Sequence, residues 1–465
     1  MIDFRIEPEL QAKLDWMAKF VRDECEAMDL LFPGHGAPYD VANRESRAYM
    51  KPLQDQVKAQ GLWGCHLGTE LGGPGFGQLT LALMNEILGR SYWAPTVFGT
   101  AAPDTGNSEI LAMFGTAEQK ATYLQPLMDG TIVSTFSMTE PQAGADPKEF
   151  TCRAWQEGNE WVIEGEKWFS SNARFAAFLI VMVVTNPESP PHERMSMLIV
   201  PTDTPGVEFI RHSQTMGDSK GEDDGTHAYI RYNKVRVPLD AMLGGPGEGF
   251  KVAQARLGGG RVHHAMRTVG KCQRAIDMML ERAVSRRTQG KQLSEHQFVQ
   301  GAIADSIIEL EQFRLLVLKT AWIIDEVEAG RMPHGASRTH IAMCKVQMAK
   351  VYHDIIQRAI QLHGSLGMTL ELPLADMWMG LPAMAKGVRT AISASGARRG
   401  GSGYARWGTA PARAWPRADT PWRPAPCALR SVRRPAPCSA GPSTCRRAAV
   451  RASCQGCRGA GSHAG

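Results

Sequence analysis

Residues 136–146 read Phe-Ser-Met-Thr-Glu-Pro-Gln-Ala-Gly-Ala-Asp, and residues 165–172 read Gly-Glu-Lys-Trp-Phe-Ser-Ser-Asn. The first run sets hydroxyl-bearing and small residues side by side, and the second sets an aromatic residue beside another hydroxyl. Such residues suit a strand and loop that lie against a flat ring and hydrogen-bond to its polar edge. The alternative for the first run is an ordinary polar turn between strands, because its Thr-Glu-Pro segment is turn-like.

Length and composition indicate a globular chain of two or three domains. The chain has 465 residues, of which 43% are hydrophobic and 21% are charged, values typical of folded globular proteins. No apolar run approaches the roughly 20 residues that cross a membrane. The acidic start of the chain lacks the features of a signal or transit peptide. The sequence therefore predicts a cytoplasmic protein with no membrane partner.

Charge and cysteine content divide the chain near residue 386. Residues 386–465 hold 15 Lys and Arg against one acid, Asp419, whereas the preceding 385 residues hold 37 bases and 46 acids, a net charge of −9. The overall charge of +5 therefore does not predict a nucleic-acid partner for the body of the protein. Five cysteines are spread through the body, as in a reduced cytosolic protein, and five more crowd the tail.

The character of the sequence changes twice before the tail. Residues 1–130 predict an N-terminal α-helical domain, residues 131–243 a central β domain, and residues 244–385 a C-terminal helical bundle. The predicted strands are short β-rich runs that suit a small barrel or sandwich: 131–138, 161–164, 178–184, 197–200, 207–210, 229–231 and 235–237. The predicted bundle helices are long and apolar on one face: 252–257, 275–285, 298–328 and 336–362.

This order of domains, together with the two opening runs, resembles the acyl-CoA dehydrogenase family over roughly residues 5–385. Residues 256–264, Arg-Leu-Gly-Gly-Gly-Arg-Val-His-His, are most similar to the branch with kinase-fused members and their bacterial relatives. The resemblance implies an FAD-dependent flavoprotein oxidoreductase of fatty acid metabolism and beta-oxidation. Its members dehydrogenate acyl-CoA thioesters between the alpha and beta carbons and pass electrons to an electron-transferring flavoprotein. The resemblance also implies a homodimer or homotetramer.

The resemblance assigns a flavin wall to the two opening runs. The backbone and hydroxyl at Met138 and Thr139 would meet the pyrimidine edge of the flavin, Ser171 would approach its N5, and Phe169 would pack nearby. The family usually has Ser where this chain has Ala145, so one hydroxyl to FAD or CoA is missing. The predicted wall residues are Phe136, Met138, Thr139, Gly144, Ala145, Phe169 and Ser171.

A later loop, residues 286–293, reads Arg-Arg-Thr-Gln-Gly-Lys-Gln-Leu. In the family this loop reaches the FAD of the partner subunit, with Arg286 on the pyrophosphate and Thr288 and Gln289 near the adenosine half. The family commonly has Phe at Gln289. From the residues alone, the loop could instead be a solvated basic helix end.

A glycine turn at residues 361–367 completes the predicted cofactor site. It reads Gln-Leu-His-Gly-Ser-Leu-Gly, and the resemblance places Gln361, Gly364 and Ser365 on the adenine and ribose side of the same FAD. A glycine C-cap of the preceding helix accounts for part of the pattern as well.

The predicted substrate residue is Arg261, which matches the family's arginine at the mouth of the acyl-CoA site. His263 and His264 follow it. Adjacent residues do not share a helix face, so they are not expected to form a metal pair, and no metal site is predicted in the body. One of the two could line the pocket, but a structural histidine with satisfied hydrogen bonds is favoured.

The catalytic acid is missing from both places where the family carries it. One is a Glu immediately before the pocket arginine, and here that position is Gly260. The other is the Asp of an Ala-Asp-Gly-Pro sequence near the last helix, and here the chain reads Ala385-Lys386-Gly387-Val388. The expected acid position thus falls near Lys386. The sequence predicts little or no turnover, and an active chain would need another acid, such as Asp376.

The tail, residues 386–465, is a low-complexity segment of Arg, Ala, Pro, Gly, Ser and Cys, a composition typical of disorder. It could bind acidic partners, and Cys454 and Cys457 could form half a metal site. The favoured hypothesis is a GC-rich gene read out of frame. One codon choice for residues 387–394, shifted by two bases, reads Gly-Pro-Asp-Gly-His-Gln-Arg, which is close to the family's sequence after the acid.

Two other functions stay open on the sequence alone. Flavin oxidases and flavin monooxygenases share the same fold and differ in the access of oxygen to the flavin. A non-catalytic FAD-binding or interaction protein, with a tail that binds acidic partners, belongs to a different class.

Overall fold

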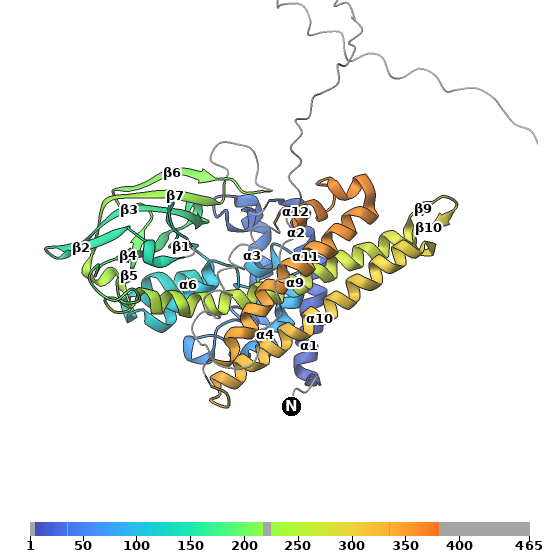
Figure 1. Cartoon of the computed structure of the whole chain (residues 1–465), viewed down its shortest axis with the longest axis horizontal. Helices are drawn as coiled ribbons and strands as arrows, with labels where there is room; N and C mark the ends of the chain where they lie inside the picture. The colour runs from blue at the N-terminus through green and yellow to red at the C-terminus, as the bar shows by residue number, and fades with distance from the viewer. Residues whose placement is uncertain (1–4, 35, 145, 217–224, 334, 381–465) are drawn as a thin grey trace, which may run out of the picture. The chain divides into compact units, whose positions relative to one another are not determined.

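The computed structural model describes residues 5–34, 36–144, 146–216, 225–333 and 335–380. They form a helical N-terminal domain, a β-sheet middle domain and a helical C-terminal domain, in the predicted order (Figure 1). The predictions for Ala145, for the acid position near Lys386 and for the tail 386–465 lie outside the described residues.

The N-terminal helices are tied to the C-terminal domain through their apolar faces and one helix cap. Their bounds are α1 (Pro8–Phe20), α2 (Glu26–Leu31), α3 (Arg44–Ala59), α4 (Gly77–Leu88), α5 (Ala94–Val97), α6 (Asp104–Phe114), α7 (Ala117–Gln119) and α8 (Gln125–Asp129). The first turn of α4 donates backbone N–H groups of Gln78 and Leu79 to the carboxylate of Asp325, at 2.7 and 2.8 Å. A carboxylate at a helix N-terminus stabilises both the free N–H groups and the helix dipole.

The middle domain consists of one hydrogen-bonded path of strands, β6-β7-β3-β2-β4-β5-β8, with β1 parallel to β4. The bounds are β1 (Ser134–Ser137), β2 (Arg153–Glu157), β3 (Glu160–Ser171), β4 (Phe178–Val184), β5 (Met195–Pro201), β6 (Val207–Ser213), β7 (His227–Pro238) and β8 (Met242–Leu243). The prediction missed β2, whose sequence Arg-Ala-Trp-Gln-Glu lacks β-branched residues. It also divided β7 at Asn233-Lys234, where Lys234 has a φ of 51°.

The path of strands folds into two layers, which is the sandwich architecture that the strand pattern allowed. All seven residues of β4 are buried because the strand serves two cores. Ile180 and Met182 pack with residues of α6 and of α9, the first helix of the C-terminal domain. Leu179 and Val181 pack instead with residues of β3 and β7. One layer therefore has helices on its outer face.

The helix α9 (Gly249–Ser285) is continuous over 37 residues, so the prediction of separate helices at 252–257 and 275–285 was wrong. Three consecutive glycines, residues 258–260, interrupt the apolar pattern, and each glycine costs a helix about 1 kcal/mol relative to alanine. The helix persists because both flanks are buried, Val252 in the core of the middle domain and Val262 in the core of the helical domains.

The other C-terminal helices are α10 (Gln297–Glu328), α11 (Ala336–His363) and α12 (Leu374–Met379). The first two agree with the predicted 298–328 and 336–362. A hairpin of β9 (Arg287–Thr288) and β10 (Lys291–Gln292) joins α9 to α10 and lies at the end of these helices that points away from the middle domain (Figure 1). None of the helices in the described residues is long and apolar enough to cross a membrane.

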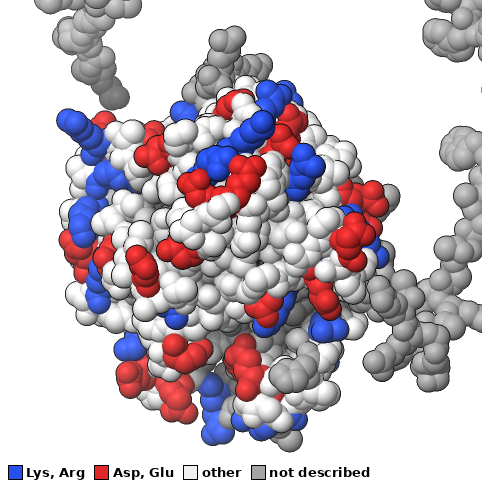
Figure 2. Space-filling view, turned by 90° about the vertical axis from the view of Figure 1, so that its left-hand side faces the viewer, with Lys and Arg blue, Asp and Glu red and all other residues white. Residues whose placement is uncertain are grey.

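The face of the molecule over the middle domain carries acidic and basic side chains in mixture (Figure 2). On the strands of the middle domain, ion pairs join opposite charges: Arg236 pairs with Glu157 and Glu160, and Arg231 pairs with Glu166. The two signs of charge therefore balance locally on this face.

Candidate functional site

The two opening runs lie side by side in the middle domain. β1 ends at Ser137, and β3 passes beside it, so that the hydroxyls of Ser137 and Ser170 are 2.9 Å apart. One step along, the backbone N–H of Trp168 donates to the carbonyl oxygen of Thr139 at 2.8 Å. The structure thus brings the predicted wall residues of β1, its following loop and β3 onto one surface.

A bulge in β3 turns Phe169 outwards from this surface. The pairing of β3 with β7 shifts register between Lys167 and Ser170, and Phe169 has a φ of 57°, which is unusual for a residue with a side chain. Its ring is 39% exposed and stacks on Trp168 with centroids 4.8 Å apart. Backbone strain of this kind persists where the surrounding structure enforces it, often at a ligand site.

A buried ion pair fixes the loop after β1. The Nζ atom of Lys167 lies 2.8 Å from Oε1 of Glu140 and donates to the carbonyl oxygen of Met138 at 3.0 Å. Glu140 also accepts the backbone N–H groups of Thr151 and Cys152, at 2.7 and 3.0 Å. Burial raises the pKa of Glu140, but Lys167 and these N–H groups outweigh burial and hold the pKa below its ordinary value. The carboxylate is therefore ionised at neutral pH and clamps both ends of the loop.

The exposed groups on the wall fit a flavin ring. Within the described part of the chain, the hydroxyls of Thr139 and Ser171 make no hydrogen bond, and both side chains are only partly buried. A Cβ added to Gly144 would lie 3.3 Å from Cγ2 of Thr139, so the glycine allows the loop to stay close to the wall. Two free hydroxyls and an exposed aromatic ring match the polar edge and the flat face of such a ligand.

The Ser171→Ala variant is expected to bind FAD about 3–10 times more weakly than the parent chain, because one neutral hydrogen bond contributes about 0.5–1.5 kcal/mol. Titration of the apoprotein with FAD, followed by flavin fluorescence, measures the change. Thr131→Val is the matched control, since its exposed hydroxyl donates to Pro126 away from the wall. Equal FAD affinities for Ser171→Ala and the parent would remove Ser171 from the site.

A partly buried arginine behind the wall was missed from the sequence. The guanidinium of Arg256 on α9 lies 4.0 Å from the ring centroid of Phe136, and its Nε donates to Asn107 at 2.8 Å. Asn107 in turn donates to the hydroxyl of Ser134 at 2.8 Å. Burial lowers the pKa of Arg256 to about 10, so the group stays charged at neutral pH. This network couples α6 and α9 to β1, and no local sequence pattern marks it.

A second overlooked group is Glu109 of α6, which lies beside the glycines of α9. A Cβ added to Gly259 would come 3.3 Å from a carboxylate oxygen of Glu109. Burial raises the pKa of Glu109 to about 7, although the nearby Arg256 opposes the rise. The carboxyl is thus partly protonated at neutral pH.

The second group of predicted cofactor residues is exposed in the C-terminal domain: Arg286, Thr288, Gln289, Gln361, Gly364 and Ser365. Gln289 and Gly290 have φ values of 50° and 78° and form the tight turn of the β9–β10 hairpin. The hairpin projects away from β1 and β3 (Figure 1). Within one chain, therefore, the structure does not bring the hairpin to the wall.

Arg261, His263 and His264 follow the glycines on α9. Burial lowers the pKa of both histidines to about 3, so both rings are neutral at neutral pH. Among the described residues Nε2 of His263 has no hydrogen-bond partner, so the prediction of satisfied hydrogen bonds was wrong for this nitrogen. A Cβ added to Gly260 would meet no atom within 4 Å. The space next to Arg261 is therefore open to a longer side chain.

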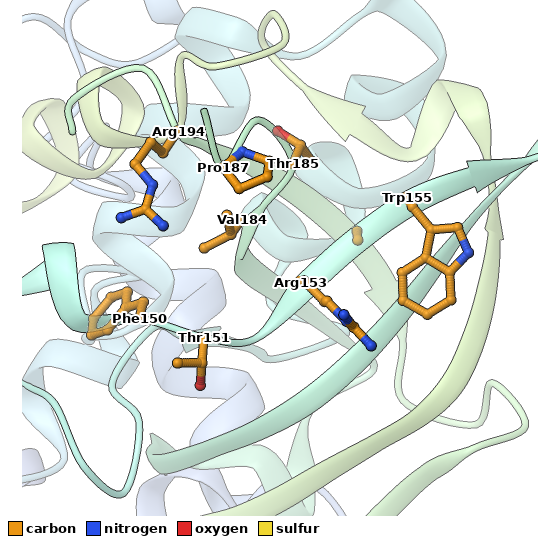
Figure 3. A pocket seen from close by; sticks show the side chains of 9 residues that line it. Phe150, Thr151, Arg153, Trp155, Val184, Thr185, Pro187 and Arg194 are labelled. Carbon is orange, nitrogen blue, oxygen red and sulfur yellow. The ribbon is translucent and has the colours of Figure 1, made fainter. Parts of the chain in front are cut away.

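A pocket of about 530 Å³ opens beside the loop that follows the wall (Figure 3). Its lining includes Arg153 and Trp155 of β2 and Arg194, and it contains no carboxylate. Arg194 also donates to the carbonyl oxygen of Lys148 at 3.2 Å, which connects the pocket to this loop. Arg153 already pairs with Glu164 at 2.6 Å, so Arg194 and the indole of Trp155 are the groups that suit an anionic or aromatic ligand. The sequence did not single out this pocket.

Models of a known protein family match three consecutive stretches of the chain. The N-terminal domain of acyl-CoA dehydrogenases matches residues 8–131, the middle domain matches residues 135–231, and the C-terminal domain matches residues 247–387. These stretches follow the helical, sheet and helical domains described above.

Curated relatives carry the same family name. The chain is 42% identical over 343 residues to "Probable acyl-CoA dehydrogenase FadE2" of Mycobacterium tuberculosis, a match that covers 72% of this chain and 81% of the relative. It is 40% identical over 333 residues to "Acyl-CoA dehydrogenase family member 11" of Rattus norvegicus, covering 71% of this chain. The match spans only 42% of the length of that rat relative.

Solved structures share the fold. A putative acyl-CoA dehydrogenase from Mycobacterium abscessus superposes with a TM-score of 0.75 at 33% identity, covering 84% of this chain and 98% of that one. Butyryl-CoA dehydrogenase from Megasphaera elsdenii superposes with a TM-score of 0.67 at 25% identity, covering 82% and 95%. A glutaryl-CoA dehydrogenase from Mycobacterium smegmatis in complex with FADH2 has a TM-score of 0.68 at 20% identity over 83% and 93%, which shows the fold alone.

Proposed function

Because the chain belongs to the acyl-CoA dehydrogenase family, we propose that its parent reaction is the FAD-dependent removal of hydrogen from the alpha and beta carbons of an acyl-CoA thioester. FAD, when bound, would supply the acceptor for the hydride that leaves the beta carbon. An electron-transferring flavoprotein would then receive the electrons. The observation that carries the proposal is the wall formed by Thr139, Phe169 and Ser171.

The roles of the wall residues follow from their exposed groups. The hydroxyl of Thr139, on the loop clamped by Glu140, would hydrogen-bond to the pyrimidine edge. Ser171 would hydrogen-bond near N5, and the ring of Phe169 would cover part of the flavin and keep water away. Arg256 stacks over Phe136 from behind and holds the wall against α9. Arg261 would lie at the mouth of the thioester site, one to two helical turns further along α9.

The cofactor contacts of the C-terminal domain would act across a dimer. Arg286, Thr288 and Gln289 are exposed on a hairpin that projects away from the wall of its own chain. An exposed guanidinium suits a pyrophosphate, with which it can form two parallel hydrogen bonds. Each FAD would therefore need residues of two subunits.

Replacing Arg286 with alanine should weaken FAD binding about 10–100-fold, because a charge-assisted hydrogen bond contributes about 1.5–3 kcal/mol. FAD retention after gel filtration at several protein concentrations measures the effect. In the parent chain, the fraction of FAD retained should fall when dilution dissociates the dimer. Arg338→Ala is the control, because this exposed side chain on α11 has no partner among the residues that the structure describes. If the Arg286→Ala variant stays dimeric and retains its full FAD content, Arg286 does not bind the FAD of the partner subunit.

The proposal includes the absence of the catalytic acid from this chain. Gly260 occupies the position where some family members have Glu, and the family match ends at residue 387, next to the other expected acid position. Two described carboxyls remain as candidates. Asp376 lies on α12 close to Tyr92, and Glu109 lies against Gly259 and Arg256. Neither occupies an acid position of the family, so we expect binding of FAD and acyl-CoA with little turnover.

The binding half of the proposal is tested by the absorbance spectrum of the purified protein. The chain should carry FAD, and acyl-CoA thioesters of differing length should perturb the flavin band. A colourless protein that takes up no added FAD would contradict the proposal. Rapid reoxidation of chemically reduced flavin by air would instead favour an oxidase or monooxygenase of the same fold.

The reading-frame hypothesis for the tail is tested separately, on the gene. Resequencing the region that encodes residues 381–395 should reveal a base inserted or lost near codon 386. An intact frame that continues unchanged to Gly465 would contradict the hypothesis, while the binding half of the proposal would stand.

A further inference from the structure

Five basic side chains form a row along α9 and α11, which we call the basic row: Arg261, His264, Arg267, Lys271 and Lys345. The four on α9 are spaced three, three and four residues apart, so they share one face of the helix. Each of these four keeps part of its surface accessible. Lys345 faces them from α11 and is only 8% exposed.

Three members of the row lie close enough to a charged neighbour for its charge to lower their pKa. Burial, and after it the charge of Arg261, lower the pKa of Lys345 to about 8. Burial likewise lowers the pKa of Lys271 to about 8, with Arg267 as the next cause. Burial and then Lys345, Arg267 and Lys271 lower the pKa of His264 to about 3. His264, Lys271 and Lys345 therefore each experience the positive charge of another member of the row.

No carboxylate of the described residues pairs with the row. Arg261, the ring of His264 and Lys345 make no hydrogen bond or ion pair within residues 5–380 that the structure describes. Arg267 is bonded only to the neutral groups of Asn85 and Thr100.

Lys271, the last member of the row on α9, also has no carboxylate partner among the described residues. Lys271 lies over the rings of Tyr92 and Tyr352, with its Nζ atom 5.0 and 6.0 Å from their centroids. Asp29 is the carboxylate that acts to raise the pKa of Lys271, and it is already paired with Arg274 at 2.6 Å. Lys345 is the buried cation of the row, and a buried cation without a partner costs several kcal/mol. The row therefore has the charge and the free donors to receive an anion.

The row starts where the thioester site is proposed. Gly260, which leaves open space beside it, immediately precedes Arg261. Arg256, which stacks over Phe136 of the wall, is five residues earlier on the same helix. At 1.5 Å per residue, His264 lies about 12 Å along α9 from Arg256, and Lys271 about 22 Å. An acyl chain that enters at the wall and follows α9 would pass along the row.

We propose that the basic row binds an anionic oxygen group on the acyl chain of the substrate, so that this chain prefers thioesters with a second negative charge, such as those of dicarboxylic acids. The proposal rests on the proposed function and adds the substrate class to it. An uncharged acyl chain would leave the row unpaired, whereas a carboxylate at the level of His264 and Lys345 would form charge-assisted hydrogen bonds.

Adipyl-CoA and hexanoyl-CoA test the proposal, because they have the same number of carbons and differ in the terminal carboxylate. Titration of the FAD-loaded protein, followed at the flavin band, should show adipyl-CoA binding about 10–100 times more tightly. Lys345→Met should reduce the ratio of the two affinities at least about ten-fold. Lys319→Met, at an exposed site on α10, should leave the ratio unchanged. Lys271→Met is a second test should Lys345→Met fail to fold.

The outcomes separate this inference from the proposed function. If neither thioester perturbs the flavin band, the proposed function fails. If both bind equally, or if Lys345→Met and Lys271→Met keep the full preference, the inference is overturned while the function stands. Inorganic phosphate is the third probe. If phosphate stabilises the unliganded protein against heat and hexanoyl-CoA then binds as tightly as adipyl-CoA, the row takes a free anion and does not select the substrate.

Discussion

Gly260→Glu is expected to accelerate the reduction of bound flavin by an acyl-CoA thioester about 10²–10⁴-fold, the usual contribution of a positioned general base. The variant places a carboxylate immediately before Arg261, at the position where part of the family carries its acid. The structure can accommodate the side chain, because a Cβ at position 260 would meet no atom within 4 Å. The helix should also gain up to about 1 kcal/mol, since glycine is the weaker helix former.

Gly260→Gln is the matched control for this variant. It adds the same number of side-chain atoms and the same helix propensity but no base, so its rate of flavin reduction should stay at the level of the parent chain. Both rates are read from the loss of the oxidised-flavin band under anaerobic conditions, with FAD content measured in parallel. Equal rates for the Glu and Gln variants, at equal FAD content, would show that a missing carboxylate is not what limits this chain.

Lys167→Met is expected to destabilise the protein by about 3–5 kcal/mol, the usual cost of removing one partner from a buried ion pair. The Lys167 and Glu140 side chains are 0% and 1% exposed, so the carboxylate left behind cannot be solvated. Loss of the Lys167–Glu140 pair should also loosen the loop after β1 and so weaken FAD binding. Thermal or denaturant unfolding measures the loss. Arg153→Gln removes an exposed pair with Glu164 and should cost no more than about 1 kcal/mol.

The pH dependence of stability should change direction in the Lys167→Met variant. In the parent chain the pKa of Glu140 lies below its ordinary value, so this group stabilises the fold above about pH 4.3. That stability is lost as the pH falls through the lowered pKa. Without Lys167, burial dominates and raises the pKa of Glu140, so the deficit of the variant should shrink as the pH falls from 7 towards 5. A deficit below about 1 kcal/mol that does not vary with pH would contradict the clamp.

The fold could be predicted from the sequence to the extent that periodicity marks buried faces. The helices 298–328 and 336–362 were found because their apolar residues repeat at helical spacing. The strand 178–184 was found because it is a continuous apolar run. The glycines at 258–260 hid the continuity of α9, since its stability comes from packing at both flanks and not from local propensity. β2 was missed for a related reason. Its pairing with β3 decides its structure, whereas its own composition does not favour a strand.

The candidate site could be predicted only where residues cluster in the sequence. The wall at residues 136–146 and 165–172 was accessible because a strand, a loop and a bulge keep its members within two short runs. Arg256 and Glu109 could not be predicted as site residues, because their neighbours Phe136 and Gly259 come from other segments. The basic row escaped notice for another reason. On the sequence it reads as scattered charges, and only the packing of α11 on α9 shows that they lack acidic partners.

We propose that this chain keeps the sites for FAD and the acyl-CoA thioester but lacks the acid that removes the alpha proton. The most direct test is to mix the FAD-loaded 465-residue chain with acyl-CoA thioesters, adipyl-CoA included, without oxygen and to follow the oxidised-flavin band. We predict that the band shifts as the thioester binds but is not bleached over many times the turnover time of about 0.1 s that is typical of enzymes. Rapid and complete bleaching in the unmodified chain would show that the chain has a working catalytic acid.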